Sequence, residues 1–197
     1  VHLKSLNVWA QPLHYLNFLI ADPVPAVSLY IEGMLVQIPA PERYAVHKLI
    51  VAQLRHQGSA KAAKDIAQAR VLIAALSASR PQEFFTVLEE ASSKGPKWKA
   101  LLDRALLLTF KAPELRHDAR RDVVSFDGEA LGARHQVSVS AEALEDHFEA
   151  KDWNADTMMA AARRHRGDIE KIAQRLFRQG PSEETLIRSE DVDQNSA

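Results

Sequence analysis

The chain of 197 residues contains no cysteine. It can therefore form no disulfide and no thiolate metal site, which is consistent with a reducing compartment. It also lacks a signal peptide and any apolar run close to the roughly 20 residues that span a bilayer. We therefore expect a cytoplasmic protein with no membrane partner.

Excess charge of one sign is also lacking. The sequence holds 25 Lys and Arg against 26 Asp and Glu, a net charge of −1. No overall attraction to nucleic acid follows, so any such binding must come from a local patch. The motifs HExxH, GxSxG, Walker A and the Rossmann fingerprint are missing as well. An apolar content of 46% and a charged content of 26% are ordinary for a globular protein.

The first part of the chain predicts a β-hairpin. Between residues 26 and 38, Val27, Leu29 and Ile31 alternate with polar residues, Glu32-Gly33 is a turn signal, and an apolar strand follows. Such an apolar second strand is typical of a sheet covered on both sides, and a hairpin alone would be marginal. We expect it to complete a mixed sheet whose other strands come from a preceding segment. A helix starting near Pro12 is predicted before it.

The stretch 38–68 predicts two helices joined by a short polar turn. Pro41 suits the first position of the first helix, where the missing N–H costs nothing. Two further helices should open at Pro81 and at Gly95-Pro96, so residues 1–110 are expected to form the hairpin followed by a helical bundle.

Long polar side chains recur at helical spacing on these two central helices. They form a predicted cationic shelf suited to a polyphosphate, made of Lys48, Arg55, Lys61, Lys64 and Asp65. We predict that Asp65 orients Lys61 across one helical turn. For Lys48, which would be costly to bury unpaired, a carboxylate and a phosphate partner remain open alternatives.

The second part of the chain predicts a small α+β domain. Residues 111–122 are polar and charged and form the predicted linker. The domain at 123–190 should contain two strands joined at Asp127-Gly128, helices capped by Ser140 and Asn154, and a closing edge strand at 185–187. Residues 191–197 are expected to be a disordered tail. The overall fold class is therefore α+β.

The run PAPERYAVHKLIVAQLR…AKAAKDIAQA, with VWAQPLHYLNFLI and GPKW, resembles the segment after the catalytic core in a bacterial family of nucleotidyltransferase-fold proteins, distantly related to AbiEii-type toxins. AbiEii-type proteins carry a Lys-x-x-Lys-Asp-x-x-Asp-like motif on a late helix. Lys61, Lys64 and Asp65 match it, and Gln68 stands where the last Asp would be.

This resemblance implies transfer of a nucleoside monophosphate from an NTP to an RNA or protein acceptor. Such enzymes begin with a Gly-Ser turn and an Asp-x-Asp strand whose carboxylates hold Mg²⁺. Here no acidic residue precedes Asp22, and the first Gly-Ser pair is Gly58-Ser59. We therefore interpret the chain as the C-terminal portion of such an enzyme, with the magnesium ligands elsewhere, and expect no catalysis by the chain as given. The alternative is a non-catalytic binding or regulatory module that retains the scaffold.

The pattern VVSFDGEAL…VSVSAEALEDHF…RGDIEKIAQRLF…TLIRSEDV resembles a small bacterial domain family of unknown function, over about 70 residues. In that family a long helix has a basic N-terminal half, which here corresponds to Arg163, Arg164, His165 and Arg166. This basic stretch is either a binding patch or a solvated face balanced by nearby acids, for which Glu142, Glu145 and Asp146 are the candidates.

Overall fold

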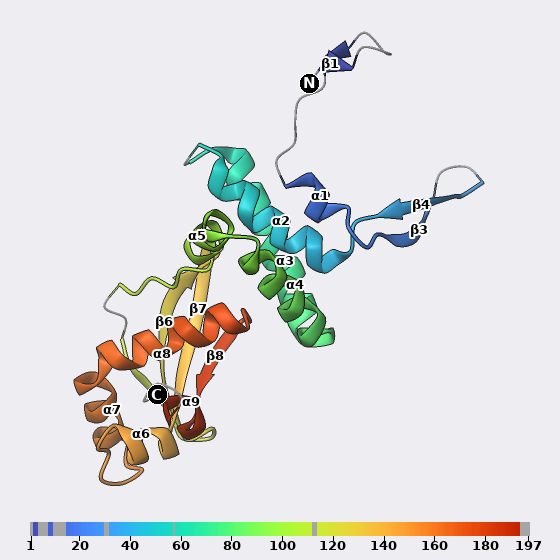
Figure 1. The fold of residues 1–197 in the computed structure, drawn as a ribbon. Helices are drawn as coiled ribbons and strands as arrows, with labels where there is room; N and C mark the ends of the chain where they lie inside the picture. The colour runs from blue at the N-terminus through green and yellow to red at the C-terminus, as the bar shows by residue number, and fades with distance from the viewer. Residues whose placement is uncertain are drawn as a thin grey trace.

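The computed structural model describes residues 2–3, 8–9, 15–29, 32–56, 58–111 and 114–193. Its fold is mixed α+β, as the sequence predicted. A hairpin and a group of helices come first, and a four-stranded sheet with helices follows (Figure 1). Within the described ranges, no helix has the length and apolar character that crossing a membrane requires.

Short strand pairs and helices make up the first half of the chain. They are β1 (His2–Leu3), β2 (Val8–Trp9), α1 (Leu16–Leu19), β3 (Val24–Ser28), β4 (Met34–Ile38), α2 (Pro41–Leu54), α3 (Ala60–Ser79), α4 (Pro81–Ser93) and α5 (Pro96–Ala105). A proline stands at the start of α2, α4 and α5, as predicted. Helix α2 is the centre of this half because it contacts α1, α3, α4 and α5, and its Val46, Leu49 and Ile50 are fully buried.

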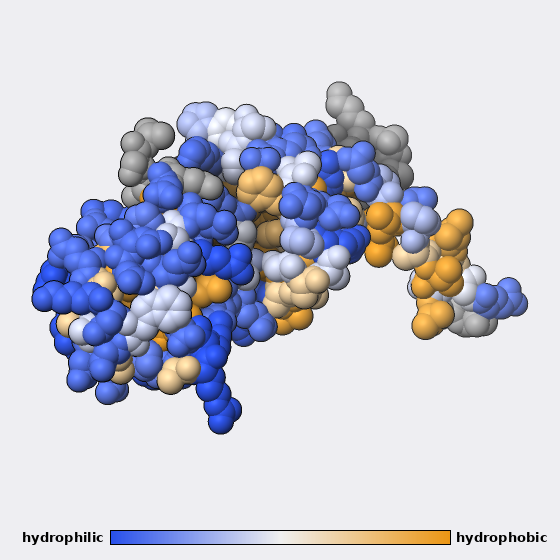
Figure 2. All heavy atoms as spheres, turned by 90° about the horizontal axis from the view of Figure 1, so that it is seen from below, coloured by the Kyte–Doolittle hydropathy of each residue, from blue (hydrophilic) through white to orange (hydrophobic). Residues whose placement is uncertain are grey.

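The hairpin of β3 and β4 projects away from these helices (Figure 1). The two strands pair only with each other among the described residues. Leu29 is 96% exposed and Leu35 73% exposed, and Val27 and Met34 are also exposed. Figure 2 shows the resulting apolar surface on the projecting end of the molecule. A two-stranded hairpin with this composition is typical of a sheet edge that lacks its cover.

A four-stranded sheet and four helices make up the described part of the second half. They are β5 (Arg116–Asp118), β6 (Val123–Ala130), β7 (Ala133–Ser140), α6 (Ala141–His147), α7 (Ala155–Arg164), α8 (Arg166–Gln179), β8 (Glu184–Ile187) and α9 (Ser189–Asp193). The strand order is β5-β6-β7-β8, antiparallel except for the parallel pair β7–β8. Helix α8 crosses the sheet (Figure 1) and buries Ile169, Ile172 and Phe177 in the shared core.

The predicted turn at Asp127-Gly128 is wrong. Strand β6 continues through both residues, and the turn falls at Leu131-Gly132, where φ is 52° and 69°. Positive φ at both central residues suits a two-residue hairpin turn. Gly128 serves packing instead, because a Cβ there would lie 2.9 Å from Cε1 of Phe110.

Other predicted boundaries also differ from the structure. The helix expected from Pro12 is only the short α1, and Pro12 itself lies outside the described residues. The long helix expected after Asn154 is split into α7 and α8 at His165. Strand β5 lies within the predicted linker 111–122, because it pairs with β6. Helix α9 extends through Asp193 into the predicted tail, where Val192 packs against the core.

The two halves are joined by hydrogen bonds as well as by a continuous apolar core. Gln174 on α8 donates to the Leu106 carbonyl at 2.9 Å, and its Oε1 accepts from the Leu108 N–H at 2.8 Å. On α3, the Ser77 hydroxyl donates to the Pro181 carbonyl at 2.5 Å. The division at 111–122 therefore stays a prediction from sequence, and in the structure side chains of both halves contact each other.

Candidate functional site

The structure brings Lys48 and Arg55 of α2 onto a single carboxylate of α3. Lys48 Nζ lies 2.7 Å from Asp65 Oδ1, and Arg55 Nε lies 2.6 Å from Asp65 Oδ2. Asp65 is 4% exposed. It takes this place because it lies on the side of α3 that also carries the buried Ala69 and Leu76, which packs against the rest of the bundle. We call Lys48, Arg55 and Asp65 the α2–α3 cluster.

Burial and ion pairing oppose each other in this cluster. Burial alone would raise the pKa of Asp65, but the hydrogen bonds from Lys48 and Arg55 outweigh it and lower that pKa below its usual value. Burial alone would lower the pKa of Lys48, but the bond to Asp65 raises it. The Lys48 ammonium also lies 5.1 Å from the centre of the Tyr44 ring. All three groups are charged at neutral pH, so the cluster keeps one net positive charge.

The carboxylate alternative for Lys48 is thus the one that the structure shows. The predicted orienting role of Asp65 toward Lys61 is wrong, because both oxygens of Asp65 bind residues of α2. Lys61 and Lys64 lie exposed on α3, and neither binds a carboxylate within the described part of the chain. The predicted shelf is therefore divided into an ion-paired inner part with one net positive charge and two solvent-facing lysines.

Two hollows adjoin the predicted residues. One of about 450 Å³ lies between α2 and α3 and is lined by Tyr44, Lys64 and Gln68 with apolar neighbours. The other, of about 300 Å³, lies beside Arg55 and Ser59 and also contacts Arg104. Both are within the size range of small-molecule sites. The second leaves room for an anion beside Arg55 of the cluster, whereas the first has mostly apolar walls and touches Lys64.

A second buried ion pair lies at the other end of α2, and sequence reasoning missed it. Arg43 is 7% exposed, and its Nη2 lies 2.6 Å from Asp22 Oδ2 and 2.9 Å from Glu90 Oε2. Its guanidinium also lies over the Phe18 ring, 5.0 Å from the centre. This arginine of α2 links the segment around α1 to α4, so its role is structural. The one available signal was a charged pair, Glu42-Arg43, opening an otherwise apolar helix.

The basic stretch of α7 and α8 is largely paired. Arg164 binds Glu149 at 2.9 Å, and Arg166 binds Glu170 at 2.7 Å while its guanidinium lies 3.8 Å from the centre of the Phe126 ring. The balancing acids are therefore Glu149 and Glu170, not the predicted Glu142, Glu145 and Asp146. The solvated, balanced face describes this stretch better than an open binding patch does.

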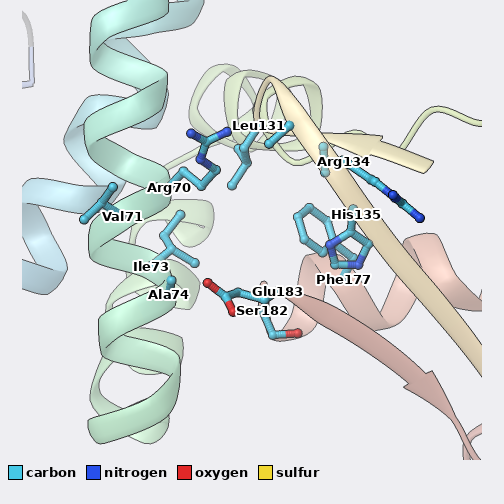
Figure 3. Close-up of a pocket in the computed structure, with 12 residues that line it drawn as sticks. Arg70, Val71, Ile73, Ala74, Leu131, Arg134, His135, Phe177, Ser182 and Glu183 are labelled. Carbon is cyan, nitrogen blue, oxygen red and sulfur yellow. The ribbon is translucent and has the colours of Figure 1, made fainter. Parts of the chain in front are cut away.

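A cavity that the sequence did not indicate lies where α3 meets the C-terminal sheet (Figure 3). Its volume is about 380 Å³. Arg70 and Ile73 come from α3, His135 from β7 and Phe177 from α8. No motif could reveal it, because its walls come from α3, β7 and α8, which lie far apart along the chain.

Metal ligation finds little support in this arrangement. Across the ranges that the structure describes, no group of three or more His, Asp or Glu side chains is placed to hold an ion.

Comparison with known families agrees with the two halves of the fold. Residues 1–93 match a family model described as nucleotidyltransferase. Residues 108–187 match a model described as protein of unknown function (DUF1488). The resemblance of the chain to a nucleotidyltransferase family followed by a domain of unknown function is thereby confirmed. Neither a curated protein nor a solved structure matches the chain.

Proposed function

We propose that this chain forms the C-terminal, nucleotide-holding portion of a nucleotidyltransferase that moves a nucleoside monophosphate from an NTP to an acceptor. The α2–α3 cluster carries the proposal. It is a partly buried pairing of two helices, with one net positive charge, inside the region that matches the nucleotidyltransferase family.

The four cations differ in burial, and this difference gives them different proposed roles. Lys48 and Arg55 fix the angle between α2 and α3 through Asp65. The Arg55 side chain is nevertheless 37% exposed, so part of it faces solvent. Lys61 and Lys64 are solvent-facing and supply charge to the triphosphate. Lysines act on phosphate as positioned point charges, which stabilise the charge that develops during transfer.

The projecting hairpin supports the same proposal. Its exposed apolar side chains suit a strand pair that joins a larger sheet, which a catalytic segment would supply. Any Mg²⁺ ligands would come from that segment as well. The alternative, a binding module that retains the scaffold, predicts nucleotide binding without transfer by any form of the protein.

The test measures ATP affinity by calorimetry and the melting temperature on the same variants. Lys64→Ala should weaken ATP binding about threefold to tenfold, as expected for one lost charge contact, with an unchanged melting temperature. Lys97→Ala is the matched control, because Lys97 is an exposed lysine on α5 with no ion pair among the described residues. Equal ATP affinity in wild type and Lys64→Ala would remove Lys64 from the site.

A further inference from the structure

The cavity of Figure 3 has an arginine, Arg70, at one end. Arg70 projects from α3 at its edge and binds no carboxylate within the described residues. Arg134, the other arginine of the lining, is already engaged, since its Nη2 lies 2.6 Å from Asp127. The charge available to a ligand is therefore that of Arg70.

The region beyond Arg70 adds to this positive character. A second hollow, of about 600 Å³, shares Arg70 and Leu131 with the cavity and is also lined by Arg104 and by Lys111, whose charge is paired with Glu129 at 3.3 Å. Arg104 donates to the side-chain and main-chain oxygens of Gln53, which are neutral, so its charge is not cancelled. Guanidinium groups in this setting favour phosphate, which they bind through paired N–H donors.

The interior of the cavity is apolar and flanked by two rings. His135 and Phe177 lie with ring centres 4.7 Å apart. His135 is 4% exposed, and its Nε2 lies 2.9 Å from the Thr185 hydroxyl. Burial lowers the pKa of His135 to about 4, so the ring is neutral at physiological pH. Ile73 of α3 forms the opposite wall. A flat, uncharged ring system fits between these walls.

The end opposite Arg70 carries a free acceptor. Glu183 lies there in Figure 3 and, among the described residues, pairs with no cation. A carboxylate at this place can accept a hydrogen bond from an amino group on the ligand. The cavity thus offers a cation at one end, flat apolar walls between and an acceptor at the other end.

We propose that this cavity binds a nucleoside monophosphate with an amino-bearing base, its phosphate on Arg70, its base between α3 and the rings, and its amino group on Glu183. The volume of about 380 Å³ lies within the range of small-ligand sites. This inference deepens the proposed function and rests on it, because a transferase needs an acceptor site separate from the NTP. The ligand is either a free mononucleotide or the end of an RNA strand.

The test is calorimetry with AMP and UMP on the whole chain. We expect AMP to bind with a Kd below about 1 mM, and UMP, which lacks the amino group, to bind at least about fivefold more weakly. Arg70→Gln should weaken AMP binding about tenfold. Arg163→Gln removes the same charge from an exposed site on α7 and should change nothing. Glu183→Gln should bring AMP and UMP closer together in affinity.

A cavity-filling variant provides an independent arm. Ala74→Leu adds apolar volume to the wall on α3 and should abolish AMP binding while the chain stays folded. A short RNA that ends in an adenylate joined through its 5′ phosphate to a tetramer distinguishes a free mononucleotide from an RNA end. If the RNA end is the ligand, this RNA should bind more tightly than AMP. No AMP binding up to about 10 mM, or equal losses in Arg70→Gln and Arg163→Gln, would overturn the inference. Either result leaves ATP binding at Lys64, and thus the proposed function, unaffected.

Discussion

The α2–α3 cluster allows one prediction to be worked out in detail. Asp65→Asn keeps the shape of the side chain but removes the charge that neutralises Lys48 and Arg55. The side chain of Lys48 is 18% exposed and that of Arg55 is 37% exposed. Losing one partner of a fully buried pair costs about 3–5 kcal/mol, and solvent screening of Arg55 reduces this. We expect the free energy of unfolding to fall by about 2–3 kcal/mol at pH 7.

The lowered pKa of Asp65 determines how its contribution to stability changes with pH. The pKa of Asp65 is lowered in the folded state, so the unfolded chain binds the proton first as the pH falls. Its contribution to stability is therefore complete above about pH 4, the unfolded pKa, and is lost as the pH falls through the folded value. The difference in the free energy of unfolding between wild type and Asp65→Asn should therefore shrink as the pH falls.

Urea unfolding followed by circular dichroism measures both quantities. Asp103→Asn is the control, because Asp103 pairs at the surface with Lys99 of α5 and, at 3.9 Å, with Arg178 of α8, and losing such exposed pairs should cost less than about 1 kcal/mol. Asp65→Asn should also bind ATP more tightly, since two cations lose their neutralising partner. A loss of stability below about 1 kcal/mol at pH 7 would show that the cluster does not hold α2 against α3.

Two further predictions concern the C-terminal half. Burial lowers the pKa of His135 to about 4, so protonation favours the unfolded chain, and the free energy of unfolding should fall by about 3 kcal/mol as the pH drops from about 6.5 to 4. In His135→Phe, the free energy of unfolding measured across this pH range should lose that dependence. An unchanged pH dependence would contradict the assignment to His135. Gly128→Ala should cost about 1–3 kcal/mol in urea unfolding because its Cβ meets the Phe110 ring. Gly180→Ala, which has no neighbouring atom within 4 Å, is its control, and equal effects of the two substitutions would refute the packing argument.

Local signals in the sequence predicted local structure well. The Ser140 hydroxyl accepts the Ala143 N–H at 3.1 Å, and Asn154 Oδ1 accepts the Asp156 N–H at 2.9 Å, so both predicted caps are confirmed. Pro41 opens α2 as expected. Each of these depends on residues within three positions of each other, which a single sequence displays.

What the sequence could not reveal depends on distant partners. Asp65 lies one turn from Lys61, yet the rotation of α3 turns it toward α2. Asp127-Gly128 is a strong turn signal, yet Phe110 packs against Gly128 and the turn moves to the next glycine. Strand β5, Arg116–Asp118, has no apolar alternation and exists because β6 lies beside it. The cavity at Arg70 combines both halves of the chain, so no single stretch encodes it.

The parallel placement of β8 beside β7 has a consequence for how the sheet assembles. The two strands are separated along the chain by three helices, so their pairing must close a long loop before any of its hydrogen bonds can form. Until then the main-chain groups of β7 on that side face water as an open sheet edge, beside the apolar Val137 and Val139. The slowest contact in this domain should therefore be its last strand pair, and the time before that closure is when the chain is most exposed to association with other chains.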